Sequence, residues 1–364
     1  MGSVAKGTSL LTVAALLLGC STLLSTSKES LSARRSADRI VPEHIILIAL
    51  DGVRREDVFN GADARLTTEL RSAQEIVPNL SNLARRGVAL GVPGTEISLR
   101  ASGPNYVSLP GYLEILTGQS AECQENNCEK LPPHGLIDAI AATTSEPRGE
   151  LAIISSWERI EHTVAKADLG TFVSTGRSGG NAAAKSLGPR TRALLDKARD
   201  VRPAPGHGDY RPDPQTIEIA LAYLEEERPR FAFVSLGDTD EFAHHDDYDA
   251  YLRALTRADA FVGQVVDLAD AWRAKGERTA IFVTTDHGRA KNFRDHGREH
   301  PESADVWLIA GGDGIAPIQG SPPNSERRLR DVAHTIAVLA DVPFPNEGES
   351  GSCISEMLAF SPAF

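Results

Sequence analysis

Five short apolar runs constrain the fold of this chain more than any other feature. The runs are rich in branched side chains and occupy residues 45–50, 151–156, 231–236, 280–285 and 306–310. Runs of this length and composition are typical of strands that are buried on both faces of a sheet. Helical patterns lie between them, and the clearest covers residues 248–276, which end on a glycine. Strands alternating with helices predict an α/β fold, in which a largely parallel central sheet is sandwiched between helices.

The N-terminal segment differs from the rest of the chain. One lysine precedes an apolar stretch at residues 10–18, which is too short to span a bilayer and fits a signal peptide. The stretch leads into Leu-Leu-Gly-Cys, which resembles the lipobox of bacterial lipoproteins, so we expect residues 1–20 to be a signal peptide whose Cys20 is lipidated; a plain cleaved signal is the alternative. Residues 21–42 predict a flexible polar tether and residues 43–364 a single domain. We therefore expect an exported protein, periplasmic or anchored to the membrane only through Cys20.

Charge and cysteine content narrow the function classes. The formal net charge of −12 argues against a protein that holds nucleic acid or an anionic membrane through a generally basic surface. An anionic substrate would therefore need a local positive charge, from a metal ion or a few arginines. Export places the cysteines in an oxidising compartment, where Cys123 and Cys128 are close enough in sequence to close one short loop and Cys353 is left over. The proline-rich stretch 201–214 predicts a surface loop and not a domain boundary.

Acidic and histidine residues follow the apolar runs. Asp51 ends the first run, Asp240 and His244 follow the third, and the fourth leads to Asp286, His287 and, in the next loop, His296. In open α/β sheets, ligand sites form at the carboxyl ends of the strands. Mixed Asp and His donors suit zinc or a similar divalent ion. The sequence therefore predicts a metal site at this edge of the sheet.

Five motifs occur in order along the chain, namely LIALDG, VSLPGYLEILTG, DTDEFAH, TTDHG and DHG. In combination they look like the alkaline phosphatase superfamily, most like its nucleotide pyrophosphatase/phosphodiesterase and sulfatase-like branches, over about residues 43–356. The resemblance implies a catalytic domain with two divalent metal ions, expected to be zinc. It implies that one ion is surrounded by Asp51, Ser108, Asp286 and His287, and the other is held by Asp240, His244 and His296. Asp238 and His245 are neighbours with the wrong spacing for the family's Asp-x-x-x-His pattern.

Ser108 matches the family's nucleophile. A serine hydroxyl is a poor nucleophile at neutral pH, and coordination to a divalent ion activates it without a separate base. The resemblance therefore implies an exported hydrolase of small-molecule phosphoric esters, either a phosphomonoesterase or a phosphodiesterase, that forms a phosphoserine. A cofactor-independent phosphoglycerate mutase would share the metal motifs, but export and the shortness of the chain argue against that family.

The stretch around Ser108 also resembles the sulfatase motif, whose first residue is oxidised to formylglycine. Ser108, Pro110 and the Thr117-Gly118 pair fall at the sulfatase spacing, but Tyr112 replaces the arginine of that motif. This replacement favours an unmodified serine and phosphorus chemistry, and we expect Tyr112 to be a packing residue. A sulfatase with a modified Ser108 is one alternative, and a metal-binding protein without catalytic activity is another.

Three polar residues are candidates for binding the substrate. Asn105 stands just before Ser108, and Arg289 follows the first DHG. Arg159 is loosely similar to the arginine of a Lys-x-Arg pair in one monoesterase branch, although Trp157 stands where the lysine would be. Monoesterases of the superfamily place extra cations on the terminal phosphate oxygens, and diesterases replace those cations. The three residues therefore bear on the choice between a monoester and a diester.

Overall fold

The computed structural model describes residues 1–2, 40–122, 124–128, 135–144, 150–163, 170–180, 187–318, 326–344 and 350–360. Cys20 and nearly all of the expected signal peptide and tether lie outside these ranges, as does Cys123. Residue contacts group Val41–Phe364 into one compact unit. Within the described ranges, no helix has both the length and the apolar character needed to cross a membrane.

The centre of this unit is an eight-stranded sheet with the strand order β2-β9-β8-β1-β7-β4-β5-β6. Its strands are β1 (His44–Leu50), β2 (Val88–Leu90), β4 (Leu151–Ser155), β5 (Phe172–Thr175), β6 (Gly179–Gly180), β7 (Phe231–Leu236), β8 (Thr279–Thr284) and β9 (Leu308–Gly312). The five central strands from β8 to β5 are parallel to one another, whereas β9 and β6 run antiparallel to their neighbours. The predicted α/β fold with a largely parallel sheet is confirmed, although the last predicted run forms the antiparallel β9.

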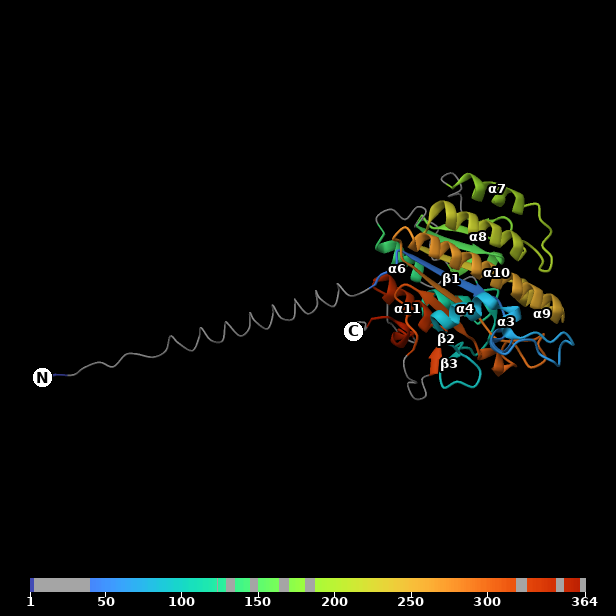
Figure 1. Ribbon diagram of the computed structural model, residues 1–364, viewed down its shortest axis with the longest axis horizontal. Helices are drawn as coiled ribbons and strands as arrows, with labels where there is room; N and C mark the ends of the chain where they lie inside the picture. The colour runs from blue at the N-terminus through green and yellow to red at the C-terminus, as the bar shows by residue number, and fades with distance from the viewer. Residues whose placement is uncertain are drawn as a thin grey trace. The chain divides into compact units, whose positions relative to one another are not determined.

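Helices cover both faces of the sheet (Figure 1). The α-helices are α2 (Arg55–Phe59), α3 (Ala73–Ile76), α4 (Pro78–Arg86), α5 (Ser108–Thr117), α6 (Leu136–Ala142), α7 (Pro189–Ala198), α8 (Asp213–Glu227), α9 (Asp238–His244), α10 (Tyr248–Arg273) and α11 (Asp331–Ala340). Side chains of β1 alternate between two cores, with Ile46 and Ile48 in the core that includes α4, α8 and α10, and Ile45 and Leu47 in the core that includes α5, α6 and α11. This two-sided burial is why the strands read as continuous apolar runs.

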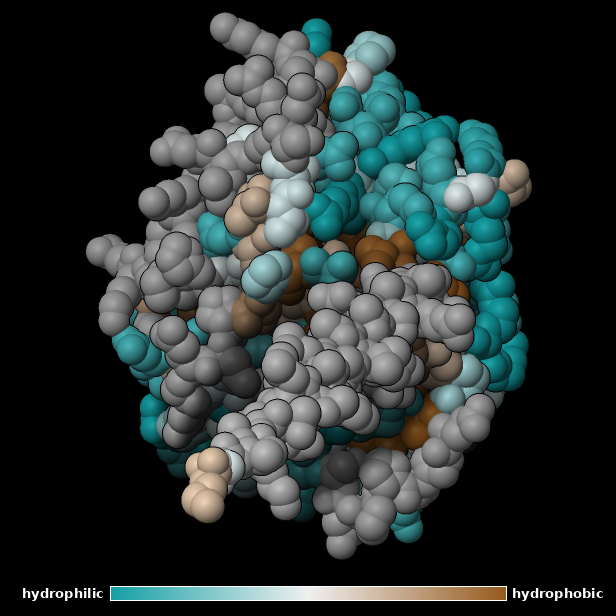
Figure 2. Space-filling view, turned by 90° about the vertical axis from the view of Figure 1, so that its left-hand side faces the viewer, coloured by the Kyte–Doolittle hydropathy of each residue, from teal (hydrophilic) through white to brown (hydrophobic). Residues whose placement is uncertain are grey.

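The surface of the described part is mostly polar. In the face drawn in Figure 2, hydrophilic residues cover most of the coloured surface, and hydrophobic residues are seen in a band across its middle. Among the described residues, the exposed large hydrophobic side chains are Met1, Ile40 and Leu70. Isolated side chains of this kind are normal on a globular protein.

Two local predictions need correction. The helix expected at residues 248–276 ends at Arg273, because the chain turns over the next residues to reach Gly276, whose φ is +91°. The stretch 201–214 is only partly a surface loop, since Tyr210 and Arg211 are buried. The Arg211 guanidinium donates to the backbone carbonyl of Ser155 and to the Ser174 hydroxyl, both at 2.8 Å, so the loop docks on the sheet. Burial lowers the pKa of Arg211 to about 9.

The short cysteine loop is only partly described. Cys128 is disulfide-bonded, and its expected partner Cys123 lies outside the described residues. The backbone N–H of Leu109, in the first turn of α5, donates to the side chain of Asn126 in this loop at 2.9 Å. The loop is therefore tied to the start of the helix that begins with Ser108.

Candidate active site

Ser108 is held at the start of α5, where two neighbouring residues help to fix its position. Pro110 lies in the first turn, where a helix needs no N–H from it. Gly111 allows close packing, because a Cβ atom there would lie 2.3 Å from the carbonyl oxygen of Asp286. The Ser108 Oγ atom then lies 3.3 Å from Asp51 Oδ1 and 3.3 Å from His287 Nε2. The hydroxyl therefore faces potential metal-ligand atoms of two residues that follow the neighbouring strands β1 and β8.

Asp51, Asp286 and His287 form a first group of potential metal ligands, which we call the first triad. One ligand atom from each lies within 4.8 Å of the others, and all three residues are buried. His287 Nδ1 lies 2.9 Å from the carbonyl oxygen of Gly288, which can only accept. When the His287 ring is neutral, Nδ1 therefore carries the hydrogen and Nε2 offers its lone pair to the triad.

The first triad holds negative charge that other protein atoms do not fully satisfy. Asp286 Oδ1 accepts from the backbone N–H of Gly52 at 3.1 Å, whereas its buried Oδ2 has no hydrogen-bond partner. Burial and the Asp51 carboxylate raise the pKa of Asp286 well above its usual range. Burial lowers the pKa of His287, but the carboxylates of Asp286, Asp51 and Asp240 outweigh it and raise that pKa to about 9. A buried carboxylate oxygen that accepts no hydrogen bond and lies 3.5 Å from His287 Nε2 fits a site for a divalent cation.

Asp240, His244 and His296 form the second triad. Asp240 and His244 lie one turn apart on α9, so both side chains project from the same face. His244 Nε2 lies 3.0 Å from Asp240 Oδ2 and 3.1 Å from His296 Nε2. The Nδ1 atom of His296 donates to the carbonyl of Tyr106 at 2.8 Å, which leaves its Nε2 as a lone pair. Two imidazole nitrogens this close need a shared proton or a cation between them.

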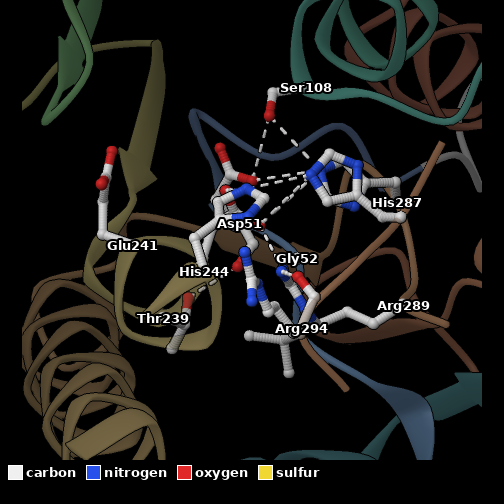
Figure 3. Close-up of polar contacts among 12 residues, drawn as sticks. Asp51, Gly52, Ser108, Thr239, Glu241, His244, His287, Arg289 and Arg294 are labelled. Atoms are coloured by element: carbon white, nitrogen blue, oxygen red, sulfur yellow. Dashed lines mark hydrogen bonds and ion pairs between the residues drawn. The ribbon is translucent and has the colours of Figure 1, made fainter. Parts of the chain in front are cut away.

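Structure and sequence agree on which residues lie together. The six side chains fall into the two groups that the resemblance implies, and Figure 3 shows the side chains of Asp51, Ser108, His244 and His287 converging. Asp240 Oδ1 is 4.0 Å from His287 Nε2, so the two triads adjoin each other. Their mixed oxygen and nitrogen donors fit divalent cations such as zinc. When bound, such cations would supply positive charge to an anionic substrate and to the Ser108 oxygen.

The two neighbouring candidates in the same segment point elsewhere. Asp238 accepts from the Tyr210 hydroxyl at 2.8 Å and lies 3.5 Å from a guanidinium nitrogen of Arg257. The exposed His245 places its Nδ1 atom 2.8 Å from the backbone oxygen of Glu241. Neither belongs to a triad, as their spacing predicts.

The three candidates for substrate binding are engaged with the protein itself. Asn105 donates to the backbone oxygen of Gln124 at 2.6 Å and accepts from the N–H of Arg298 at 2.9 Å. Arg159 donates to the carbonyls of Asn126 and Cys128 at 3.2 and 2.9 Å. The buried Arg289 pairs with Asp240 and donates to the carbonyl of Arg294 at 2.6 Å. In this structure Asn105 and Arg159 therefore hold loops in place, and Arg289 holds the side chain of Asp240.

Tyr112 has a polar contact that the expectation of a packing residue missed. The ring is fully buried and packs edge-on against Phe233, but its hydroxyl donates to Asp51 Oδ2 at 3.0 Å. The signal in the sequence was the spacing, because Tyr112 follows Ser108 by one helical turn and so shares its face of α5.

A cavity lies beside the two triads and does not include Ser108. Its volume is about 330 Å³, and its lining includes residues 54–56 and 288–291. The arginines in that lining are already paired, Arg54 with Asp57 and Arg55 with Asp305, both at 2.8 Å. The lining also includes Lys291, and its basic side chains outnumber the acidic ones.

A family model and several known proteins match parts of this chain. Residues 209–342, which include the second triad, Asp286 and His287, match the model of the metalloenzyme superfamily. The chain is 24% identical over 219 residues to the 2,3-bisphosphoglycerate-independent phosphoglycerate mutase of Chromohalobacter salexigens, covering 59% of this chain and 38% of the relative. It is 25% identical over 142 residues to the mutase of Helicobacter pylori, covering 38% of this chain and 27% of the relative. The chain thus spans about a third of the length of these relatives.

Two solved structures share the fold over most of both chains. The alkaline phosphatase PafA matches with a TM-score of 0.55 and 11% identity, over 88% of this chain and 99% of that one. A 2-O GAG sulfatase matches with a TM-score of 0.58 and 14% identity, over 88% of this chain and 75% of that one. At these identities the likeness shows the fold alone. Together with the family model, it confirms the resemblance to the alkaline phosphatase superfamily.

Proposed function

We propose that this chain, with its alkaline phosphatase-like fold and motifs, is an exported hydrolase of phosphoric esters with two divalent metal ions and Ser108 as its nucleophile. The observation that carries the proposal is the position of the Ser108 Oγ atom, which lies 3.3 Å from a potential metal-ligand atom of Asp51 and 3.3 Å from one of His287 in the first triad. A hydroxyl among metal-ligand atoms is placed for activation without a separate base. Export and the Cys20 anchor rest on the N-terminal pattern, and fractionation of cells that express the full chain tests them.

The reaction we propose has two stages. The Ser108 oxygen forms a bond to phosphorus while the bond from phosphorus to the ester oxygen breaks, and the alcohol leaves with a proton. Water then cleaves the phosphoserine and restores the Ser108 hydroxyl. Asp51, His287 and Asp286 hold their positions throughout, because each is buried and anchored by strand β1 or β8.

The engagement of Arg159 and Arg289 favours a phosphodiester over a phosphomonoester. A monoester carries a second negative charge, which the monoesterases of the superfamily offset with extra cations. Arg159 is instead bound to backbone carbonyls and Arg289 to Asp240. A small-molecule diester is therefore our first expectation for the substrate.

A sulfatase is the second candidate, because the fold is shared with a 2-O GAG sulfatase and the Ser-x-Pro spacing is present. Tyr112 argues against it, since its neutral hydroxyl stands where the sulfatase motif has a guanidinium. The mass of the peptide that contains Ser108 reveals any conversion to formylglycine.

One experiment separates these functions. The purified chain is assayed on bis-p-nitrophenyl phosphate, p-nitrophenyl phosphate and p-nitrophenyl sulfate, with and without a chelator. We expect hydrolysis of the phosphate esters, fastest for the diester, and loss of this activity with the chelator. Ser108→Ala should lower kcat/KM by roughly a thousandfold or more, about 4 kcal/mol in barrier, because no other oxygen replaces the nucleophile.

Ser81→Ala is the matched control. Ser81 lies on α4, which covers the opposite face of the sheet from α5, so this variant should retain activity. Near-normal turnover by Ser108→Ala would exclude Ser108 as the nucleophile. A preference for the sulfate ester would favour the sulfatase, and metal binding without any hydrolysis would favour a non-catalytic protein.

A further inference from the structure

Tyr112 lies at the centre of a small hydrogen-bond network behind the first triad. Its hydroxyl donates to Asp51 Oδ2 at 3.0 Å, and the Ser235 hydroxyl donates to the Tyr112 oxygen at 3.0 Å. The Ser155 Oγ atom lies 3.4 Å from the Ser235 Oγ atom. Tyr112, Ser155 and Ser235 are all buried, so water does not replace these contacts. The network joins α5, β7 and β4 to the end of β1.

The chemistry of the groups fixes the direction of these hydrogen bonds. An ionised carboxylate can only accept, so the single hydroxyl hydrogen of Tyr112 points to Asp51. The Tyr112 oxygen can then only accept, and Ser235 supplies the hydrogen that it receives. Ser235 therefore orients the tyrosine hydroxyl toward the carboxylate.

The two oxygens of Asp51 consequently have different roles. Oδ2 is bound by Tyr112, whereas Oδ1 lies 3.3 Å from the Ser108 Oγ and 3.4 Å from His287 Nε2. We propose that Tyr112 is a positioning residue, which holds the Asp51 carboxylate so that Oδ1 faces the ligand atoms and the nucleophile. The proposal rests on the proposed function, because it assigns Oδ1 to the metal ion of the first triad.

A tyrosine suits this role better than the arginine of the sulfatase motif. A guanidinium at this point would add a positive charge beside Asp51 and compete with a cation for the same carboxylate. The neutral hydroxyl orients Asp51 and leaves its charge available. Partners that orient metal ligands in this way commonly change metal affinity by about 10 to 100-fold when they are removed.

The test is metal binding by the metal-free full-length chain, titrated with Zn²⁺ against a chromophoric chelator. Tyr112→Phe removes the hydroxyl and keeps the ring that packs against Phe233. We expect the affinity of one site to fall by about 10 to 100-fold and the other site to be unchanged. Ser235→Ala should cause a loss of the same kind but less than about tenfold, since Tyr112 can still donate. Saturating Zn²⁺ should restore most of the lost hydrolysis.

Tyr251→Phe is the matched control. The Tyr251 hydroxyl donates to the buried carboxylate of Asp57 at 2.9 Å, outside both triads, so the same atom is removed from the same kind of contact. Wild-type affinity at both sites in Tyr112→Phe and Ser235→Ala, or an equal loss in Tyr251→Phe, would overturn the positioning role. If Tyr112→Phe shows the expected loss but the wild type hydrolyses no ester, the proposed function fails and the positioning role stands.

Discussion

At the scale of single residues, the second triad offers the cleaner test of the metal assignment. His244 contacts only groups of that triad among its described polar partners, Asp240 at 3.0 Å and His296 at 3.1 Å. Asp240 is less suitable, because its removal would leave the buried Arg289 without its carboxylate. We therefore expect His244→Ala to lower the metal content from two ions per chain to about one, measured by mass spectrometry of the metals after dialysis.

The adjacent His245→Ala is the control for His244→Ala. His245 is exposed and contacts the backbone of its own helix, so its loss should leave both ions bound. Retention of two ions by His244→Ala, or an equal loss in both variants, would contradict the assignment of the second triad.

At the scale of one element, α5 combines Ser108, the proposed nucleophile, with a buried acid, Glu114. Glu114 lies in the last half of the helix, where its carboxylate accepts from the backbone N–H of Ser102 at 2.9 Å and from the Ser102 hydroxyl at 2.9 Å. Burial raises the pKa of Glu114 from 4.5 to about 7, although the Ser102 hydrogen bonds lower it. The folded protein therefore stabilises the protonated form of Glu114 relative to its carboxylate.

This shift predicts a pH dependence with a definite sign. The folded pKa lies above the unfolded one, so the stability that the neutral Glu114 provides is lost as pH rises from 4.5 to about 7. Relative to Glu114→Gln, which cannot ionise, the wild type should lose about 3 kcal/mol or less over this range. Denaturant unfolding of both proteins at pH 5 and pH 8 measures the difference. Glu218→Gln on the exposed side of α8 is the control, and a difference that stays constant with pH would contradict the prediction.

At the scale of the whole unit, the parallel sheet brings the charged ends of several strands together. Asp51 follows β1, Asp286 and His287 follow β8, and α9 with Asp240 follows β7. The strands pair in the order β8-β1-β7, so these ends are adjacent although they are up to 236 residues apart in sequence. Without cations, protons must offset the resulting carboxylate repulsion.

Metal removal should therefore destabilise the protein in a pH-dependent way. The pKa of Asp286 is raised well above its usual range and that of His287 is raised to about 9, so both groups favour the protonated form on folding. The stability that His287 provides is fully present below its unfolded pKa of 6.5 and is lost as pH rises to about 9, and the Asp286 effect has the same sign. We expect a chelator to lower the thermal unfolding midpoint more at pH 9 than at pH 6.

Adding Zn²⁺ back to the chelated protein should restore the midpoint at each pH. A gap between the metal-loaded and chelated proteins that stays the same, or narrows, as pH rises would show that protons do not stand in for cations at the triads.

The sequence by itself determined the fold class and the five apolar runs that contain or overlap β1, β4, β7, β8 and β9, and the resemblance of its motifs implied the members of both triads. The fold class depends on local pattern, because buried strands leave continuous apolar runs, and ligand sites form where parallel strands end at one edge of a sheet. The resemblance alone could also set aside the neighbouring Asp238 and His245, since their spacing does not match the family's Asp-x-x-x-His pattern.

Only the tertiary structure decided what the polar residues around the triads do. The donors of Arg159, Arg289 and Asn105 are satisfied by carbonyls and a carboxylate that the fold brings close, and no local pattern in the sequence records those partners. The same holds for Tyr112, whose partner Asp51 lies 61 positions earlier and reaches it only because α5 packs beside the end of β1. Ligand chemistry is a property of residue types and spacing, whereas the partner of a buried side chain is a property of long-range packing.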